Sequence, residues 1–580
     1  MTAYRRNSSS ATALAALAAA ASALQADTQI VSVATSGAQS TGYSDEPFVS
    51  SDGRWVVFSS FGVELVTPDL GGYSDVFLRD RLTGVTERIS EGVGGAQADY
   101  HSRPGPVSAD GRFVAFWSSA SNLAANDTNG VADVFVRDRL SLSNSVASLS
   151  STGAAGNGAS SGPAMTPDAR YVAFQSTATN LVAASDLNGT QLDVFLRDRV
   201  LGTTVLVSAV PTGGFASVGG AQWPSISADG RFVAFSALDG SFVSGDFNGM
   251  SDIFVRDVVA GTTRIASLGA GGQLGNGGSH FPSISADGAV VAFQSSAWNL
   301  VVGDTNQIMD IFVRDLTLAT TVRASVGQGG AQAQPNIHFQ GAYLPSLSAD
   351  GKRVAFLSLS QNLIPNDTNS GGDVFVHDLA HTTTVCASVN SLGVQANFGC
   401  GYPTLSGDGG TVAFSSGANN LTPGDSNAEA DVFARRVGAS LATVYCTAKT
   451  NSLGCVPAIS FSGYASQSQA VVFQITASQV LNQRSGLLLY GFEAQALPYQ
   501  GGLLCVRPPT VRTPLQNSGG TMGPSDCSGA YALDLNARIQ AGLAFGLDPG
   551  ARAFAQYWMR DPGSAVPTGL SDALDFVVSP

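Results

Sequence analysis

The sequence predicts an all-β protein: a seven-bladed β-propeller of four-stranded blades, followed by a small β-sandwich domain. Three observations predict it. Of the 580 residues 44% are apolar and only 12% are charged, while 67 are Gly, which is typical of a turn-rich β protein with an uncharged polar surface. Two short motifs recur together over residues 28–445. After residue 445 this period stops, and four of the six cysteines follow.

Residues 1–26 are expected to be a secretory signal peptide. Arg5 and Arg6 precede an apolar run of small residues from Ala11 to Leu24, and Ala-Ser-Ala follows at 21–23, the order found in such signals. The alternative is an amphipathic or disordered N-terminus. The run is too short to span a bilayer, and no later stretch of eighteen apolar residues exists. We therefore expect an exported chain, extracellular or periplasmic, with no membrane span.

The repeat is defined by two motifs that keep the same spacing. The first is a Ser-x-Asp-Gly turn, and the second is Asp-Val/Ile-Phe. Successive copies of the turn lie 58, 58, 61, 58, 63 and 58 residues apart, so the two motifs define seven copies. The turn carboxylates are Asp52, Asp110, Asp168, Asp229, Asp287, Asp350 and Asp408. The second motif begins at Asp75, Asp133, Asp193, Asp252, Asp310, Asp373 and Asp431.

Each copy contains four strands. In the fifth they are "FPSIS", "AVVAFQS", "DIFVRDL" and "TTVRASV". The second and third are apolar on both faces, as expected for a sheet covered on both sides. Sheets stacked around a ring have that environment.

An open solenoid is the alternative, and it would need capping units. The segment "TQIVSVATSGAQ" at 28–39 instead matches the fourth-strand segment "TERISEGVGGAQ" at 86–97. A spare fourth strand ahead of the first copy is what ring closure requires. We expect Thr28 to Ala34 to complete the last blade, which places the propeller at 27–445.

The repeat resembles a known family. "PSISADGRFVAFSA", followed by "DIFVRD", is similar to the TolB-like and WD-repeat-like propeller repeats of exported bacterial proteins. The chain departs from TolB in lacking an N-terminal α/β domain and in having seven units, where TolB has six. The resemblance implies a scaffold, and a scaffold of this kind hosts many functions.

The loop between the second and third strands carries candidate calcium ligands in the pattern Asp-x-Asn-x-x-x-Asp. Oxygen ligands at alternate positions around a turn suit calcium. The alternative is a turn in which the Asp and Asn side chains bond their own backbone. The candidate ligands are Asp127, Asn129, Asp133, Asp246, Asn248, Asp252, Asp304, Asn306, Asp310, Asp367, Asn369, Asp373, Asp425, Asn427 and Asp431.

The same face of the ring is expected to carry a binding site. Aromatic and histidine residues precede or begin the first strands, where they would form a funnel for a sugar or a peptide, or alternatively fill the centre of the ring. A net charge of −14 argues against nucleic acid and anionic membranes, leaving a protein or polysaccharide partner. The candidate binding residues are His101, Trp223, His280, His338 and Tyr402.

We expect a non-enzymatic protein. None of the five histidines belongs to a recognisable catalytic motif with a nucleophile. The Gly-x-Ser-x-Gly match at 158–162 lies in a Gly- and Ser-rich linker, without the strand and helix that a nucleophile elbow needs. The alternative is a glycan- or peptide-cleaving enzyme that uses a pair of carboxylates in the funnel.

Residues 446–580 are expected to form a disulfide-bonded β-sandwich, with a short helix within "NARIQAGLAFGL" at 536–547. "YCTAKTNSLGCVPAI" and "FAQYWMRDP" resemble a C-terminal module of secreted planctomycete-type proteins. An even number of cysteines agrees with an oxidising compartment. Proximity in sequence favours three bridges, although fifteen connectivities are possible. The pairs would be Cys386 with Cys400, Cys446 with Cys455, and Cys505 with Cys527.

Overall fold

In a computed structural model the chain divides into two compact units, and the division falls between Val437 and Gly438. The described residues are 28–578, except 185, 187, 217–219, 336–340, 365, 366, 368, 370, 392, 438–442, 446, 447, 463, 464, 466–472, 501, 548–550 and 566. The predicted signal peptide lies outside them. Within this part of the chain, no helix is long and apolar enough to cross a membrane.

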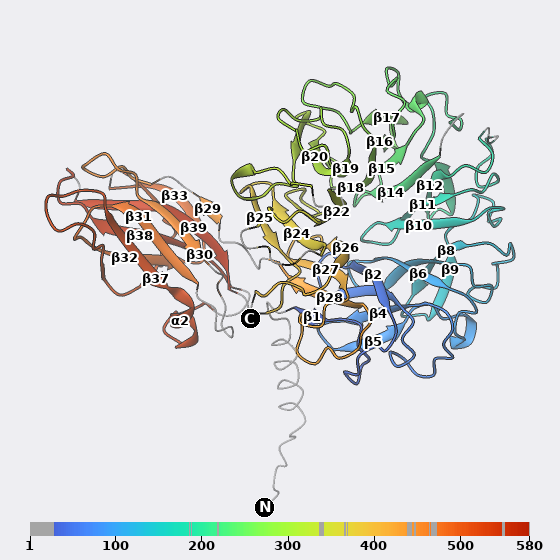
Figure 1. The fold of residues 1–580 in the computed structure, drawn as a ribbon, viewed down its shortest axis with the longest axis horizontal. Helices are drawn as coiled ribbons and strands as arrows, with labels where there is room; N and C mark the ends of the chain where they lie inside the picture. The colour runs from blue at the N-terminus through green and yellow to red at the C-terminus, as the bar shows by residue number, and fades with distance from the viewer. Residues whose placement is uncertain are drawn as a thin grey trace, which may run out of the picture. The chain divides into compact units, whose positions relative to one another are not determined.

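The first unit consists of seven four-stranded antiparallel sheets arranged as blades around an axis (Figure 1). Blade 1 contains β2 (Ser44–Val49), β3 (Trp55–Ser60), β4 (Asp75–Asp80) and β5 (Val85–Arg88). Blade 2 contains β6 (Ser102–Val107), β7 (Phe113–Ser118), β8 (Asp133–Asp138) and β9 (Ser143–Val146). Blade 3 contains β10 (Ser160–Met165), β11 (Tyr171–Ser176), β12 (Asp193–Asp198) and β13 (Thr203–Leu206).

The remaining blades repeat this order. Blade 4 contains β14 (Ala221–Ile226), β15 (Phe232–Ala237), β16 (Asp252–Asp257) and β17 (Thr262–Ile265). Blade 5 contains β18 (Ser279–Ile284), β19 (Val290–Ser295), β20 (Asp310–Asp315) and β21 (Thr320–Arg323). Blade 6 contains β22 (Ala342–Leu347), β23 (Arg353–Ser358), β24 (Asp373–Asp378) and β25 (Thr383–Cys386). Blade 7 contains β26 (Cys400–Leu405), β27 (Thr411–Ser416) and β28 (Asp431–Arg436). Short 3₁₀ turns lie at Val93–Gly95, Gly240–Phe242 and Gln328–Gly330.

The N-terminal strand closes the ring, as the sequence predicted. β1 (Gln29–Ile30) is the fourth strand of blade 7 and pairs antiparallel with β28. Its start is anchored as well, because Arg435 donates a 2.9 Å hydrogen bond to the Thr28 hydroxyl. The first strand of blade 1 packs against the first strands of both blade 2 and blade 7. These contacts join the first blade to the last, so the propeller is a closed ring.

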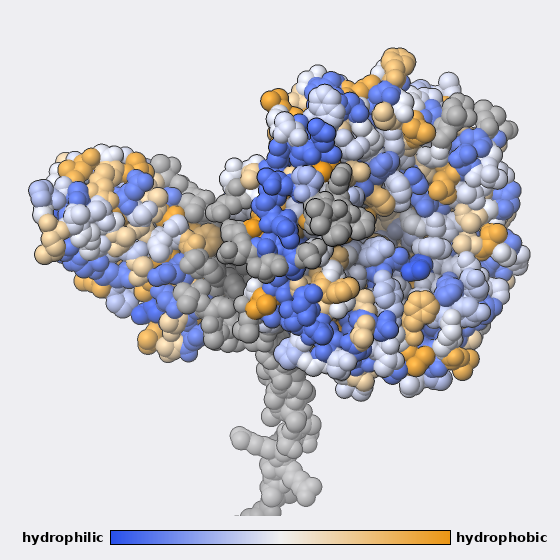
Figure 2. All heavy atoms as spheres, viewed as in Figure 1, coloured by the Kyte–Doolittle hydropathy of each residue, from blue (hydrophilic) through white to orange (hydrophobic). Residues whose placement is uncertain are grey.

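The hydrophobic core lies between successive blades. Phe58 and Phe77 of blade 1 are fully buried and stacked, and the same pair of phenylalanines recurs in the second and third strands of the other six blades. One core cluster joins residues of blades 1 and 2, and another joins blades 2 and 3. This explains why the second and third strands have almost no polar face. On the face shown in Figure 2, both hydrophilic and hydrophobic residues reach the surface of this unit.

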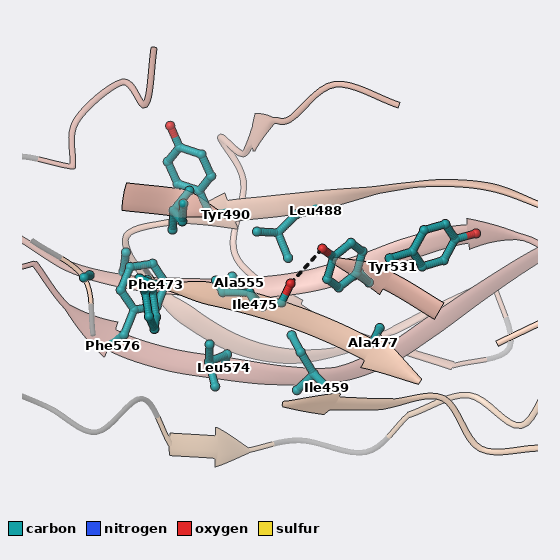
Figure 3. Close-up of a cluster of buried hydrophobic side chains, with 14 of the residues drawn as sticks. Ile459, Phe473, Ile475, Ala477, Leu488, Tyr490, Tyr531, Ala555, Leu574 and Phe576 are labelled. Atoms are coloured by element: carbon teal, nitrogen blue, oxygen red, sulfur yellow. Dashed lines mark hydrogen bonds between the residues drawn. The ribbon is translucent and has the colours of Figure 1, made fainter. Parts of the chain in front are cut away.

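The second unit contains two main sheets that share one core, which confirms the predicted β-sandwich (Figure 3). One sheet contains β29 (Thr443–Tyr445), β39 (Thr568–Val577), β38 (Arg552–Arg560), β32 (Ser485–Gly491), β35 (Val511–Arg512) and β36 (Gln516–Asn517). The other contains β30 (Ala458–Ser462), β31 (Gln474–Val480) and β37 (Gly529–Asp534), and a hairpin joins β33 (Ala494–Tyr499) to β34 (Gly502–Val506). The predicted helix is α2 (Leu535–Gln540). The Tyr557 hydroxyl bonds the carbonyl of Ile475 across the core, at 3.1 Å.

Two expectations about this region need correction. Thr443–Tyr445 pair with β39 of the second unit, so the propeller ends before residue 445, because β1 supplies the strand that would have followed β28. The disulfide pairing also differs, since Cys455 bonds Cys527 and not Cys446. Cys505 is disulfide-bonded too, whereas Cys386 and Cys400 carry free thiols. Cys446 lies outside the described residues. In a sandwich, strands far apart in sequence lie side by side, which makes sequence proximity a weak guide to pairing.

Candidate functional site

A β-bulge interrupts the first strand of all seven blades, in its pairing with the second strand. In six blades the bulge contains a residue that directly precedes a proline and has a positive φ, between 48° and 60°. Blade 2 has Pro104 at the corresponding place. A bulge of this kind re-aims the side chain that it contains. We call these seven positions the bulge ring: Glu46, Pro104, Gly162, Trp223, Phe281, Leu344 and Tyr402.

The bulge ring is strained and held in place by neighbouring blades. A residue other than Gly in this left-handed region costs about 1–3 kcal/mol and persists only where its surroundings impose it. Gly162 satisfies the requirement without strain, yet five other blades place larger residues there. The backbone N–H of Trp223 donates to Gln175 Oε1 of the preceding blade at 2.9 Å, and that of Leu344 donates to Gln294 Oε1 at 3.0 Å. Strained positions of this type cluster at ligand-binding sites.

Blades 4 to 7 contribute the apolar side of the bulge ring. The rings of Trp223 and Phe281 are stacked with centroids 4.1 Å apart, and the His280 ring meets Trp223 edge-on at 5.6 Å. Trp223, Phe281 and Leu344 are half-buried, while the Tyr402 side chain is exposed. Burial lowers the pKa of His280, so this imidazole is neutral at pH 7. This side therefore offers uncharged aromatic surface.

Blades 1 and 2 contribute the charged side. Arg103 Nη1 lies 3.4 Å from Glu46 Oε2, and the Tyr43 hydroxyl donates to Asp45 at 2.5 Å. Burial raises the pKa of Glu46, although the nearby Arg103 opposes the shift. Burial also raises the pKa of Tyr402, helped by the negative charges of Asp45 and Glu46. The carboxylates of blade 1 therefore lie close to the aromatic side at the junction with blade 7.

The structure brings some of the predicted binding residues together and separates others. Trp223, His280 and Tyr402 lie on or beside the bulge ring, whereas His338 is outside the described residues. His101 belongs to another aromatic cluster with Phe61, Tyr73 and Tyr100. Its Nδ1 accepts a 3.0 Å hydrogen bond from the Ser74 backbone. Glu46, Phe281 and Leu344 were not among the predicted binding residues, although each directly precedes the proline of a first strand, which is a signal visible in the sequence.

The aspartate that begins each third strand has a structural partner in every blade. In blade 2, the Ser148 hydroxyl donates to Asp133 and accepts from the Val134 N–H at 3.1 Å. Asn129 Nδ2 donates to the other Asp133 oxygen at 2.6 Å and to the carbonyl of Gly156 at 2.9 Å. The serine-to-aspartate bond recurs in all seven blades. We call it the Asp–Ser clasp.

In blades 5 and 7, a side chain bridges the two aspartates of the Asp-x-Asn-x-x-x-Asp loop, and the bridging residue differs between the two blades. In blade 5, Arg323 Nη1 lies 2.9 Å from Asp304 Oδ1 and 3.6 Å from Asp310 Oδ2. In blade 7, Gln39 Nε2 donates to both Asp425 and Asp431 at 2.7 Å.

Several of the candidate calcium ligands hydrogen-bond other protein groups in the structure. In blades 2 and 4 the asparagine presents its N–H groups, and not its oxygen, to the aspartate at the start of the third strand. Among the residues that the structure describes, no group of three His, Cys, Asp or Glu side chains is placed to hold a metal ion. The hydrogen-bonded turn, the alternative that the sequence left open, accounts for these contacts.

Seven radial four-stranded sheets with first strands innermost and a borrowed fourth strand define a β-propeller. Comparison with solved structures finds distant likenesses of TolB-like and WD40-like type. A protein from Agrobacterium tumefaciens assigned as TolB is 16% identical, with 49% of this chain and 80% of that chain covered and a TM-score of 0.31. The β-propeller domain of Cps50 (Swd1) from Myceliophteria thermophila is 11% identical, with 68% and 97% covered and a TM-score of 0.36.

An oligogalacturonate lyase from Vibrio parahaemolyticus is 12% identical, with 68% of this chain and 91% of that chain covered and a TM-score of 0.40. No protein-family model matches the chain. No curated protein matches it either. Propellers of this architecture have varied functions, so the fold leaves the activity open.

Proposed function

We propose that this protein is an exported, non-enzymatic scaffold that binds a protein or glycan partner at the bulge ring. The observation that carries the proposal is the retention of Glu46, Trp223, Phe281, Leu344 and Tyr402 at positive φ, where glycine is free of strain. A fold that needed only the bulge has a simpler solution in Gly162. The larger side chains therefore have a use other than folding.

The chemistry of the bulge ring fits such a partner. Stacked aromatic rings bind the apolar faces of sugars or side chains, and polar groups beside them supply orientation. Export is supported by the Cys455–Cys527 disulfide, because disulfides persist in oxidising compartments. N-terminal mass analysis of the protein secreted by an expression host tests export. A chain that retains residues 1–26 contradicts it.

Binding is tested with arrays of glycans and peptides and with purified variants. We expect Trp223→Ala and Phe281→Ala to lose ligands that the wild type retains. The matched control is Leu140→Ser with Leu318→Ser, because these side chains are 76% and 70% exposed and lie at the opposite ends of the blades. Equal binding by both sets of variants contradicts the proposal.

A second candidate is a carboxylate-dependent glycan- or peptide-cleaving enzyme. It is favoured by the contacts at the charged side, where Glu46 has a raised pKa and lies beside Arg103. A carboxyl group of this kind can act as a general acid. Incubating the same glycans and peptides with wild type and Glu46→Gln separates the two candidates. A binder leaves every compound intact, whereas the enzyme releases fragments that the variant does not.

A further inference from the structure

Two free thiols lie at the junction of blades 6 and 7. Cys386 ends β25, the outer strand of blade 6, and Cys400 begins β26, the innermost strand of blade 7. The Cys400 N–H donates to the Gly372 carbonyl at 2.8 Å, directly before β24, and Cys386 is paired with Phe375 of the same strand. Both cysteines are therefore positioned by the start of β24, from either side of the blade boundary.

Both sulfurs reach the same hydroxyl group. Cys386 Sγ lies 3.3 Å from Ser388 Oγ, and Cys400 Sγ hydrogen-bonds Ser388 as well as Ser416. Ser388 is the clasp serine of blade 6, completely buried and bonded to Asp373. The Ser388 hydroxyl donates to Asp373 and accepts from the Val374 N–H, so its position is fixed, and both thiols lie close to it.

No other junction of the propeller has this pair. Cys400 lies fourteen positions after Cys386, and the same spacing in blades 1, 2 and 4 pairs Arg88 with Ser102, Val146 with Ser160, and Ile265 with Ser279. The repeat thus supplies the geometry everywhere, and thiols occupy both positions only beside the closing blade. Blade 7 is also the one whose fourth strand is not connected to its third by a hairpin.

We propose that Cys386 and Cys400 are an oxidisable pair that cross-links blade 6 to blade 7 by thiol–disulfide exchange. The oxidant is a small or protein disulfide, such as oxidised glutathione. One cysteine, as the thiolate, attacks the disulfide and releases one thiol. The second cysteine then attacks the mixed disulfide, forms the Cys386–Cys400 bond and releases the second thiol. Two protein thiols are oxidised and one disulfide is reduced to two thiols, so protons and electrons balance.

Burial raises the pKa of the Cys400 thiol to about 12 and also raises the pKa of the Cys386 thiol. Exchange in the folded protein is therefore slow at neutral pH and faster at higher pH, because the thiolate is the attacking species. A cross-link between blades stabilises the closed ring by restricting the open chain.

The test incubates the full-length protein with oxidised glutathione at pH 8.5, and also refolds it from urea in a glutathione redox buffer. Alkylation and peptide mapping follow. We expect a Cys386–Cys400 peptide pair in both samples and a melting temperature a few degrees above that of the reduced protein. Cys386→Ser should leave Cys400 with one bound glutathione, and Cys386→Ser with Cys400→Ser should show no shift that depends on the pair.

The repeat offers a matched control in Val146→Cys with Ser160→Cys, which places thiols at the equivalent junction of blades 2 and 3. Circular dichroism and gel filtration establish that each variant is folded. The proposal is overturned if Cys386 and Cys400 are both alkylated in the two oxidised samples. It is equally overturned if the native pair forms only bridges to other cysteines.

Discussion

At the scale of single residues, the repeated aspartates are folding determinants first. In each Asp–Ser clasp the serine hydroxyl donates to one oxygen of a buried carboxylate and accepts from the second backbone N–H of the third strand, as Asp133, Ser148 and Val134 show. A buried carboxylate without such donors is costly. Burial still raises the pKa of several clasp aspartates, Asp193 and Asp252 to about 6. The aspartate of the Asp-Val/Ile-Phe motif thus marks the point where the start of the third strand is hydrogen-bonded to the serine that follows the fourth strand.

We predict that Ser148→Ala lowers the free energy of unfolding by about 1–3 kcal/mol, because it leaves the Val134 N–H and one Asp133 oxygen without their partner. Urea unfolding measures the change. Ser145→Ala, three residues earlier, within β9, and exposed, should stay within about 0.5 kcal/mol of wild type. Similar losses for the two variants contradict the role of the clasp.

We predict that the melting temperature is the same, within about a degree, in millimolar calcium and in chelator. The reason is that protein groups already contact loop carboxylates: Asn129 in blade 2, Arg323 in blade 5 and Gln39 in blade 7. A ligand that binds only the folded state raises stability with the logarithm of its concentration. Such a rise with calcium, absent with magnesium, refutes this prediction and supports calcium binding.

At the scale of elements, the bulge in the first strand places a side chain larger than glycine at a strained backbone position in five of the seven blades. We predict that Tyr402→Gly leaves the free energy of unfolding unchanged or raises it by up to about 1 kcal/mol, since Tyr402 is exposed and has a φ of 48°. The same change should weaken ligand binding. The reverse substitution, Gly162→Tyr, should destabilise the protein. Denaturant unfolding of both variants, with binding measured in parallel, checks this prediction, and a large destabilisation by Tyr402→Gly contradicts it.

Neighbouring blades are also joined through the third strand. Arg197 Nη1 donates to the Ser150 carbonyl of the preceding blade at 2.9 Å, and Arg79, Arg137, Arg314 and Arg435 make the same kind of contact. In blade 6 the residue at this place is His377, which is 2% exposed and lies 2.9 Å from the Thr384 hydroxyl through Nδ1. Burial lowers the pKa of His377 to about 4.

This pKa predicts a pH dependence with a definite sign. The folded protein binds the His377 proton less well than the unfolded chain, whose pKa is about 6.5. The contribution of the neutral His377 to the free energy of unfolding is therefore fully present above pH 6.5. It is lost as the pH falls from about 6.5 to about 4, and the total loss is about 3 kcal/mol. Unfolding of wild type and His377→Gln at pH 7 and pH 4.5 measures it, and wild type should lose more of its free energy of unfolding than the variant between the two pH values. An unchanged difference contradicts the assignment.

Strand order and blade number were predictable because two motifs mark each copy of the repeat, one in the turn and one in the third strand, and both recur with the same spacing. The bulge ring was only partly predictable. Glu46 and Leu344 share no side-chain chemistry, and only the backbone conformation groups them. The pairing of Cys455 with Cys527 depends on which strands of the sandwich are neighbours, and that order is not written in the spacing of the cysteines.

At the scale of the whole molecule, the ring depends on a strand of two residues. Val31 follows β1 and is 1% exposed; it packs in a cluster with Val56 and Phe58 of blade 1 and Val432 of blade 7. Its N–H donates to the Val432 carbonyl at 2.7 Å. Every other fourth strand is tied to its blade by a short hairpin, whereas this one is held by non-covalent contacts: these, its pairing with β28, and the side chains of Thr28 and Ser32.

We predict that Val31→Pro releases the N-terminal strand, since proline has no backbone N–H and removes this hydrogen bond. Limited proteolysis should then cut within residues 28–34, a region protected in the wild type. Ala147→Pro is the matched control, because the Ala147 N–H donates to Val134 at 2.7 Å in the same place of blade 2, where a hairpin retains the strand. That variant should also lose stability, but its N-terminal segment should stay protected. Cleavage of residues 28–34 at equal rates in the two variants shows that closure does not depend on Val31, and that contacts elsewhere hold blade 7 to blade 1.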